Sequence, residues 1–261
     1  MSAASAVSTN AFNAFHSWLS KSGVKMDNRF VRVERSPLDG GRGLVAIQPI
    51  EKGTKVVEVP QELGLAASGI KGSDIGKYLK GFQGWTGDTG LIALQLLWER
   101  SKGAKSKMES WVAVLPAPGD LDMPLFWEEE NLSLADASST RGISGFGDDV
   151  DEDYAWLQAN TFGPNPKAFP PAEFTLELFR WAVGVVLSRS FFVDGELRMV
   201  PLVDFVNHSP RSRREPEGGP TGLFGTSRAV VLVSERDYQE GEEFFVSYGP
   251  KGAAAYLEEN G

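Results

Sequence analysis

The spacing of apolar residues near the start of the chain predicts a helix. Large apolar side chains recur there at helical intervals: Phe12, Phe15, Trp18 and Leu19. Gly23 follows them and is a typical signal for the end of a helix. We therefore expect an amphipathic helix over roughly residues 11–21, with one face packed into the fold.

Between residues 30 and 60 the pattern changes to short extended stretches separated by turns. Residues 30–34, 43–47 and 55–59 are expected to be strands, and the glycine-containing segments 36–41 and 51–53 are expected to be turns. This order of strands and tight turns does not fit a βαβ unit.

The middle of the chain is predicted to be mostly helical from about residue 101 to 190. Before it, residues 91–100 place Leu91, Leu94 and Leu97 on one helix face. The clearest helical pieces inside it are 128–131 and 174–189, and the proline-rich stretch 162–171 is expected to be a linker or turn. The acidic run 148–153, with five acids in six residues, is interpreted as a solvated loop or a helix N-terminus rather than a binding site.

After Arg189 the pattern again predicts strands. Asp194-Gly195 is a hairpin signal between 191–193 and 197–200, and residues 211–220 are polar and read as a loop. Two further strands are expected at 229–233 and 243–247, joined across a turn at 239–241. The predicted fold class is therefore α+β, with short strands at both ends, a helical insert at about 100–188, and no internal repeat.

The composition excludes several kinds of chemistry. The 261 residues include no cysteine, which excludes disulfides, iron–sulfur clusters, thiolate zinc sites and a cysteine nucleophile. With only two histidines, His16 and His208, a multi-histidine metal centre is not expected. The net charge of −9 disfavours nucleic-acid binding and weakly favours a basic protein partner. The strongest apolar run, the eight uncharged residues 181–188, is too short to span a membrane.

Residues 41–46 match the G-x-G-x-x-A dinucleotide fingerprint but lack its context. The fingerprint requires a preceding strand and a following helix, whereas Pro49 and Gly53 follow closely here and strands are expected next. Two interpretations of Gly41 and Gly43 stay open and are compatible: a tight turn with positive φ, and a close approach of the backbone to a ligand.

Two further segments place unusual polar groups at the ends of apolar stretches. Residues 203–209 lead from an apolar stretch into Asp204, Asn207, His208 and a serine, and no G-x-S-x-G elbow supplies a serine nucleophile. Residues 241–249 form a turn and an apolar strand that ends in Tyr248, just before a glycine.

Taken in order, these segments resemble the SET-domain methyltransferases, in the branch of RuBisCO large-subunit methyltransferase and the actin-histidine methyltransferase. The resemblance covers roughly residues 12–261 and includes the long helical insert. The residues that match are Gly41–Leu44, Ser110-Trp111 with Val114-Leu115-Pro116, Ser188–Phe191, Asp204–Ser209, and Gly241-Glu242 through Ser247-Tyr248-Gly249.

The resemblance implies a SET core of short strands with a pseudoknot, and S-adenosylmethionine as cofactor. Backbone groups of Arg42, Gly43 and Leu44 would contact the cofactor's amino-acid portion, and Arg189 would pair with its carboxylate. Asp204 would lie close by. Asn207 and His208 would bind the amino group and the adenine edge, and His208 is not expected to be a general base.

The resemblance also implies methyl transfer to an amine with Tyr248 as the catalytic residue. Tyr248 would hold the amine and the methyl group in line, and Phe191 would line the lysine channel. An apolar channel and the nearby sulfonium would both lower the acceptor's pKa from the value of about 10.4 for a free lysine. No metal is required.

The family pattern is not matched everywhere near the end of the chain. Lys251–Ala254 replaces the usual Ser-Asn, and Asn260 stands where relatives have a tyrosine that shapes the target channel. We expect an N-terminal segment and helix at 1–23, a SET domain at 24–250, and at 251–261 the start of a region that relatives continue into a helical domain.

The sequence therefore predicts a protein-lysine N-methyltransferase acting on a non-histone protein, as a monomer without a nucleic-acid or membrane partner. The alternatives are a histidine N-methyltransferase on the same fold and a catalytically degenerate SET interaction module. The compartment stays open between cytoplasm, nucleus and chloroplast.

Overall fold

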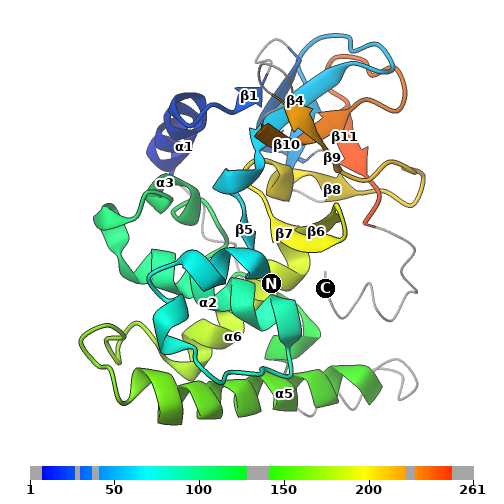
Figure 1. Ribbon diagram of the computed structural model, residues 1–261. Coiled ribbons are helices and arrows are strands. Elements are labelled where there is room, and N and C mark those ends of the chain that lie inside the picture. Colours follow the sequence, from blue (N-terminus) through cyan, green and yellow to red (C-terminus); the bar gives the residue numbers. More distant parts are fainter. Residues whose placement is uncertain (1–7, 27–29, 37–40, 128–140, 222–226, 249–261) are drawn as a thin grey trace. The chain divides into compact units, whose positions relative to one another are not determined.

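The computed structural model describes residues 8–26, 30–36, 41–127, 141–221 and 227–248 (Figure 1). The expected helix at 128–131, most of the turn at 36–41 and the departures at 251–254 and 260 lie outside these residues. The chain divides into two compact units. One contains residues 14–64 and 189–250, called the β unit below, and the other contains residues 1–13, 65–188 and 251–261, called the helical unit.

The first helix forms where the sequence predicts it. Helix α1 runs from Thr9 to Lys21, and Gly23 follows it with φ +80°. Phe15 and Leu19 are buried on its inner face, and the Phe15 ring lies 5.8 Å from that of Phe205 in the β unit. The apolar stripe read from the sequence is thus the packed face of this helix.

The described residues of the β unit form two four-stranded sheets and a hairpin. One sheet has the order β1 (Lys25–Met26), β4 (Lys55–Pro60), β10 (Ser227–Val233) and β9 (Glu217–Thr221), all antiparallel. The second has the order β2 (Val31–Arg35), β3 (Arg42–Ala46), β11 (Glu243–Val246) and β8 (Asn207–His208). Most strands match the predicted ones, but β9 lies in the segment 211–220 that was read as a loop, and that part of the prediction is wrong.

The predicted hairpin is confirmed. β6 (Ser190–Val193) pairs antiparallel with β7 (Glu196–Met199), and Asp194 and Gly195 both have positive φ, 55° and 79°. Positive φ at both central residues is what a tight primed turn requires. A short strand, β5 (Leu65–Ala66), begins the helical unit after the 3₁₀ turn η1 (Gln61–Leu63).

The helical unit packs its main helices around aromatic side chains. They are α2 (Gly87–Ser101), α3 (Glu109–Val112), α5 (Arg141–Leu157), which continues as the π-helical turn η6 (Gln158–Phe162), and α6 (Leu176–Arg189). Short 3₁₀ turns connect them: η2 (Ala67–Gly72), η3 (Gly76–Tyr78), η4 (Gly103–Lys105) and η5 (Pro124–Phe126). The rings of Phe162, Phe169 and Phe174 lie 5.0–5.1 Å apart, so the proline-rich stretch forms turns that anchor buried aromatics.

The acidic run 148–153 lies inside α5, so its interpretation as a loop or helix N-terminus is wrong. The Asp153 side chain is buried and accepts hydrogen bonds from Trp85 N (2.8 Å), Thr86 N (3.0 Å) and Thr86 Oγ1 (2.5 Å). Asp151 binds the guanidinium of Arg180 through two contacts of 2.8 and 2.5 Å. Asp151 and Asp153 are therefore tolerated in a helix because groups from other elements bind their carboxylates.

The α+β fold class is confirmed.

Candidate functional site

Strand pairing in the β unit brings together three segments that are far apart in the sequence. β11 pairs antiparallel with β3, with Phe244 opposite Leu44, and parallel with β8, with Phe245 opposite Asn207. Because β11 lies between β3 and β8, the 42–46, 207–208 and 243–248 segments meet at one junction.

Strained backbone leads into this junction. Leu202 is fully buried and has φ 72°, which costs a non-glycine residue on the order of 1–3 kcal/mol. It directly precedes the 3₁₀ turn η7 (Val203–Phe205), which directs the chain toward β8. The surrounding core thus fixes the segment that carries Asp204 and Asn207 in an unfavourable conformation, which is typical of functional sites.

Arg189, the last residue of α6, is held beside Asp204. Its Nη1 donates a hydrogen bond to the Asp204 carbonyl at 2.9 Å and lies 3.8 Å from a carboxylate oxygen of the same residue. The guanidinium also lies over the Phe205 ring, 5.4 Å from its centre. Its Nε is buried, and no acceptor in the described part of the chain hydrogen-bonds to it. Arg189 therefore retains a desolvated donor for an acceptor from outside the protein.

A second guanidinium, that of Arg42, adds to the positive potential near Arg189. Burial, and to a smaller extent the nearby charge of Arg189, lower the pKa of Arg42 from its usual value. Two cations held close enough to repel each other in a partly desolvated place favour an anion. The junction is thus suited to a carboxylate.

The Asn207 side chain spans β3 and β11. Its Nδ2 donates hydrogen bonds to the Arg42 carbonyl at 3.1 Å and to Glu243 Oε1 at 2.7 Å. Both N–H groups of the amide are therefore used within the protein, and its carbonyl oxygen is the group left to accept from a ligand.

Glu243 is a residue that the sequence interpretation missed. It is 3% exposed, and its second carboxylate oxygen accepts a hydrogen bond from Ser36 Oγ at 2.6 Å. The signal available in the sequence was an acid at the first position of an otherwise apolar strand. Its hydrogen-bond partners, Ser36 and Asn207, lie 207 and 36 residues away in the sequence. Local pattern alone does not reveal such contacts.

Gly43 makes room for this carboxylate. A Cβ at position 43 would lie 2.1 Å from Glu243 Oε1 and 3.1 Å from Asn207 Nδ2. Gly43 lies in β3 and is not among the glycines with positive φ. The turn interpretation is therefore wrong for Gly43, and the close approach at Gly43 is to Glu243 within the protein itself.

Tyr248 is anchored at both its backbone and its side chain. Its N–H donates to His208 Nδ1 at 3.1 Å, and its phenol donates to the Val206 carbonyl at 2.8 Å. The ring meets Phe191 edge-on at 5.3 Å between centres and lies 5.1 Å from the His208 ring. His208 thus uses Nδ1 to position Tyr248.

The structure places all nine predicted site residues in the β unit: Arg42, Gly43, Leu44, Arg189, Phe191, Asp204, Asn207, His208 and Tyr248. Direct contacts connect Arg42 with Asn207, Arg189 with Asp204, and Tyr248 with Phe191 and His208, and the charge of Arg189 acts on Arg42. The Leu44 side chain is fully buried, and the residue lies between Val33 of β2 and Phe244 of β11. Leu44 therefore belongs to the core beneath the junction.

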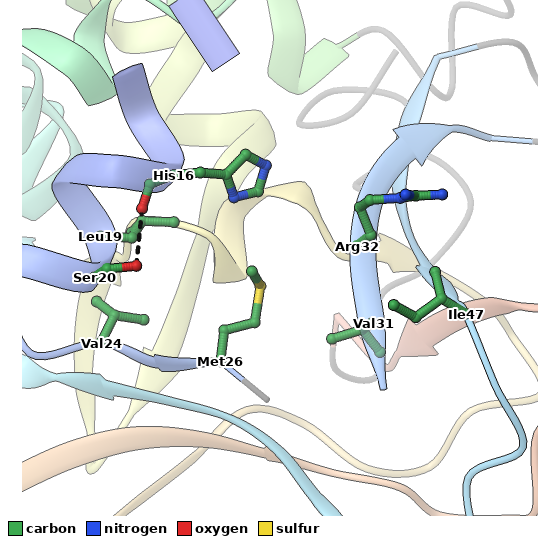
Figure 2. Close-up of a pocket in the computed structure, with 8 residues that line it drawn as sticks. All are labelled: His16, Leu19, Ser20, Val24, Met26, Val31, Arg32 and Ile47. Carbon is green, nitrogen blue, oxygen red and sulfur yellow. Dashed lines mark hydrogen bonds between the residues drawn. The ribbon is translucent and has the colours of Figure 1, made fainter. Parts of the chain in front are cut away.

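The other histidine lines a separate hollow of about 260 Å³ between α1 and β2 (Figure 2). His16, Met26 and Arg32 border this hollow with apolar side chains around them. Burial, and to a smaller extent the charge of Arg32, lower the pKa of His16, which favours the neutral imidazole. Ser20 Oγ donates to the His16 carbonyl rather than to its ring. Among the described residues that line the hollow, no hydroxyl is paired with the imidazole as nucleophilic catalysis would require.

The described part of the chain has neither a metal-binding cluster nor a membrane-spanning helix. No group of three or more His, Cys, Asp or Glu side chains is arranged to hold a metal ion. No described helix combines the length and the apolar character needed to span a bilayer.

The SET domain family matches residues 41–249, a range that includes all nine candidate site residues. The chain belongs to the SET domain family. It is 30% identical over 244 residues to a tobacco (Nicotiana tabacum) relative, the chloroplastic ribulose-1,5-bisphosphate carboxylase/oxygenase large subunit N-methyltransferase, covering 90% of this chain and 47% of the relative.

Two further comparisons agree with this assignment. A crystal structure of the SET domain of LSMT bound to lysine and AdoHcy superposes with a TM-score of 0.83 at 26% identity, covering 96% of this chain and 56% of that chain. The zebrafish (Danio rerio) actin-histidine N-methyltransferase is 25% identical over 244 residues, covering 85% of this chain and 38% of the relative. The resemblance to the RuBisCO methyltransferase branch is thus confirmed, and the chain spans about half the length of the curated relatives it matches.

Proposed function

We propose that this chain is an S-adenosylmethionine-dependent protein-lysine N-methyltransferase that acts on a non-histone protein. The observation that carries the proposal is the gathering of Arg189, Asn207 and Tyr248 in one unit around the β3–β11–β8 junction. A lysine-bound and AdoHcy-bound SET domain with the same fold supports lysine over other acceptors.

The residues at the junction fit the cofactor. The buried, unsatisfied Nε of Arg189 and the neighbouring Arg42 guanidinium suit the carboxylate of its amino-acid portion. The carbonyl oxygen of Asn207 suits its ammonium group, and Asp204 adds a negative charge beside Arg189. Arg42 and Gly43 lie beyond the residues of β3 that pair with β11, and backbone groups of Arg42, Gly43 and Leu44 are proposed to contact the amino-acid portion of the cofactor.

S-adenosylmethionine, when bound, supplies a methyl group on a sulfonium centre. Tyr248 is the proposed catalytic residue, because its phenol is fixed by Val206 while its oxygen retains acceptor capacity. An oriented oxygen at that place holds the acceptor nitrogen and the methyl group in line and favours charge leaving sulfur. His208 fixes the backbone of Tyr248, so it acts as a positioning residue and not as a base.

The acceptor must carry a free electron pair on nitrogen. The edge of Phe191 against Tyr248 forms an apolar wall, and desolvation there lowers the pKa of a lysine side chain. The same aromatic faces attract a methylated ammonium through cation–π interaction. Phe191 is therefore the proposed channel residue.

The proposed partner is a protein, without nucleic acid or membrane, and the chain is proposed to act as a monomer. The net charge of −9 supports a basic protein partner and opposes phosphate backbones.

Calorimetry with S-adenosylmethionine is the first test, and binding in the micromolar range is expected. Absence of binding at millimolar cofactor would contradict the proposal and favour a SET interaction module without catalysis. The second test is transfer of a radiolabelled methyl group to a cell extract, followed by mass spectrometry of the labelled residue. Methyl-lysine is expected. Methyl-histidine would favour the alternative suggested by the similarity to the actin-histidine enzyme.

A further inference from the structure

Glu243 is a buried carboxylate whose position needs an explanation. It is 3% exposed, and in the described part of the chain no lysine, arginine or histidine lies within ion-pairing distance of it. Burying an acid without a cation is costly unless hydrogen bonds compensate. The two donors it has are Ser36 Oγ at 2.6 Å and Asn207 Nδ2 at 2.7 Å.

The fold keeps space for the contact between Glu243 and Asn207. Any side chain at position 43 would place its Cβ 2.1 Å from the Glu243 carboxylate and 3.1 Å from the Asn207 amide. β3 therefore has a glycine, with no side chain, at the position where these two groups meet. An acid that served only to fill the core would be replaced more cheaply by an apolar residue.

The carboxylate allows Asn207 only one amide orientation. In the observed orientation, Nδ2 faces two acceptors, Glu243 Oε1 and the Arg42 carbonyl. The flipped amide would place its oxygen against both of them, and two acceptors at 2.7 and 3.1 Å repel each other. The carbonyl oxygen of Asn207 is therefore directed away from Glu243.

We infer that Glu243 is a positioning residue for cofactor binding. It fixes the Asn207 amide so that the carbonyl oxygen is presented to the ammonium group of the cofactor's amino-acid portion, and it acts through Asn207 without touching the cofactor. This inference rests on the proposed function.

The variant Glu243→Gln tests the inference because it keeps the size but removes the acceptor-only carboxylate. A glutamine amide pairs with either orientation of Asn207, so only the weaker contact with the Arg42 carbonyl at 3.1 Å still favours the observed orientation. The probes are S-adenosylmethionine and 5′-methylthioadenosine, which has the same nucleoside but no ammonium group. Calorimetry is expected to show about tenfold weaker binding of S-adenosylmethionine and less than a twofold change for 5′-methylthioadenosine.

Glu242→Gln is the matched control, because the neighbouring glutamate is bound to Gln239 N and Arg236 at the surface. It is expected to leave both affinities unchanged. Should Glu243→Gln fail to fold, Glu243→Asp retracts the carboxylate by one methylene and is expected to give the same selective loss.

A double-mutant cycle separates positioning from general damage. In an Asn207→Ala background, Glu243→Gln is expected to have no further effect on the ratio of the two affinities. Equal losses for both probes, or an unchanged affinity for S-adenosylmethionine, would overturn the role of Glu243 alone. If the unaltered protein binds neither probe, the proposed function fails and the inference fails with it.

Discussion

Arg189 combines a satisfied donor and an unsatisfied one, and this makes its contribution to ligand binding measurable. Nη1 is held by the Asp204 carbonyl, whereas the buried Nε has no acceptor in the described part of the chain. An external carboxylate that accepts from this guanidinium forms a charge-assisted hydrogen bond without the cost of desolvating the donor again.

Replacing Arg189 with alanine is therefore expected to weaken binding of S-adenosylmethionine by roughly 1–3 kcal/mol. Calorimetry on the purified variant provides the measurement. Arg228→Ala is the control, because Arg228 is exposed and pairs with Asp194 in the hairpin turn. Equal affinities of the Arg189→Ala variant and the unaltered protein would remove Arg189 from the site.

Tyr248 is expected to affect the transfer step more than cofactor binding. The variant Tyr248→Phe keeps the ring contacts with Phe191 and His208 and the backbone hydrogen bond to His208. It loses only the oxygen that lies 2.8 Å from the Val206 carbonyl. Steady-state assays are expected to show kcat lower by about 100-fold, with the Kd for the cofactor changed less than threefold. A kcat equal to that of the unaltered enzyme would argue against a catalytic tyrosine.

At the scale of secondary-structure elements, α5 stabilises the start of α2 from within the helical unit. The buried Asp153 carboxylate accepts hydrogen bonds from the backbone of Trp85 and Thr86, the residues just before α2. N–H groups at the start of a helix have no partner within it, and a carboxylate there also interacts favourably with the helix dipole. Asp153 therefore acts as a cap supplied by another helix.

The variant Asp153→Ala is expected to reduce the free energy of unfolding by about 1–3 kcal/mol, because it leaves these buried donors without an acceptor. Urea unfolding followed by circular dichroism measures the change. Asp148→Ala, at an exposed position of the same helix, is expected to have an effect below about 0.5 kcal/mol. Similar losses in both variants would mean that helix propensity, and not the cap, is responsible.

Elements with strong local signals could be predicted from the sequence, and contacts made over long sequence distances could not. The stripe on α1 and the Asp194-Gly195 turn carry their signal within a few residues. The acids of α5 were misread, because the Asp153 contacts with α2 cross 67–68 residues. Likewise the sequence left Gly43 open between a tight turn and a close approach to a ligand, because the group that actually approaches it, the Glu243 carboxylate, belongs to a strand 200 residues later. In the site, the order of motifs identified Arg189, Asn207 and Tyr248, but the carboxylate behind Asn207 required the strand pairing.

At the scale of the whole molecule, the proposed cofactor residues all belong to one of the two compact units. Arg42, Arg189, Asn207 and Tyr248 lie in the β unit, which the chain enters twice, at 14–64 and at 189–250. Cofactor binding is therefore expected to order two distant stretches of sequence together. At a cofactor concentration 100 times its Kd, binding stabilises the folded protein by about 2.7 kcal/mol.

Hydrogen–deuterium exchange followed by mass spectrometry tests which segments of the chain this binding stabilises. At exchange times short enough to report local opening, S-adenosylmethionine is expected to protect peptides that cover β3, η7–β8 and β11. Peptides from α2 and the middle of α5, which hold no proposed cofactor residue, are expected to gain less protection. The Arg189→Ala variant at the same cofactor concentration is the control and is expected to lose the protection in all three β-unit segments together. Protection that is larger in α2 than at the β3–β11–β8 junction would place the cofactor elsewhere, because local protection follows the groups that the ligand holds.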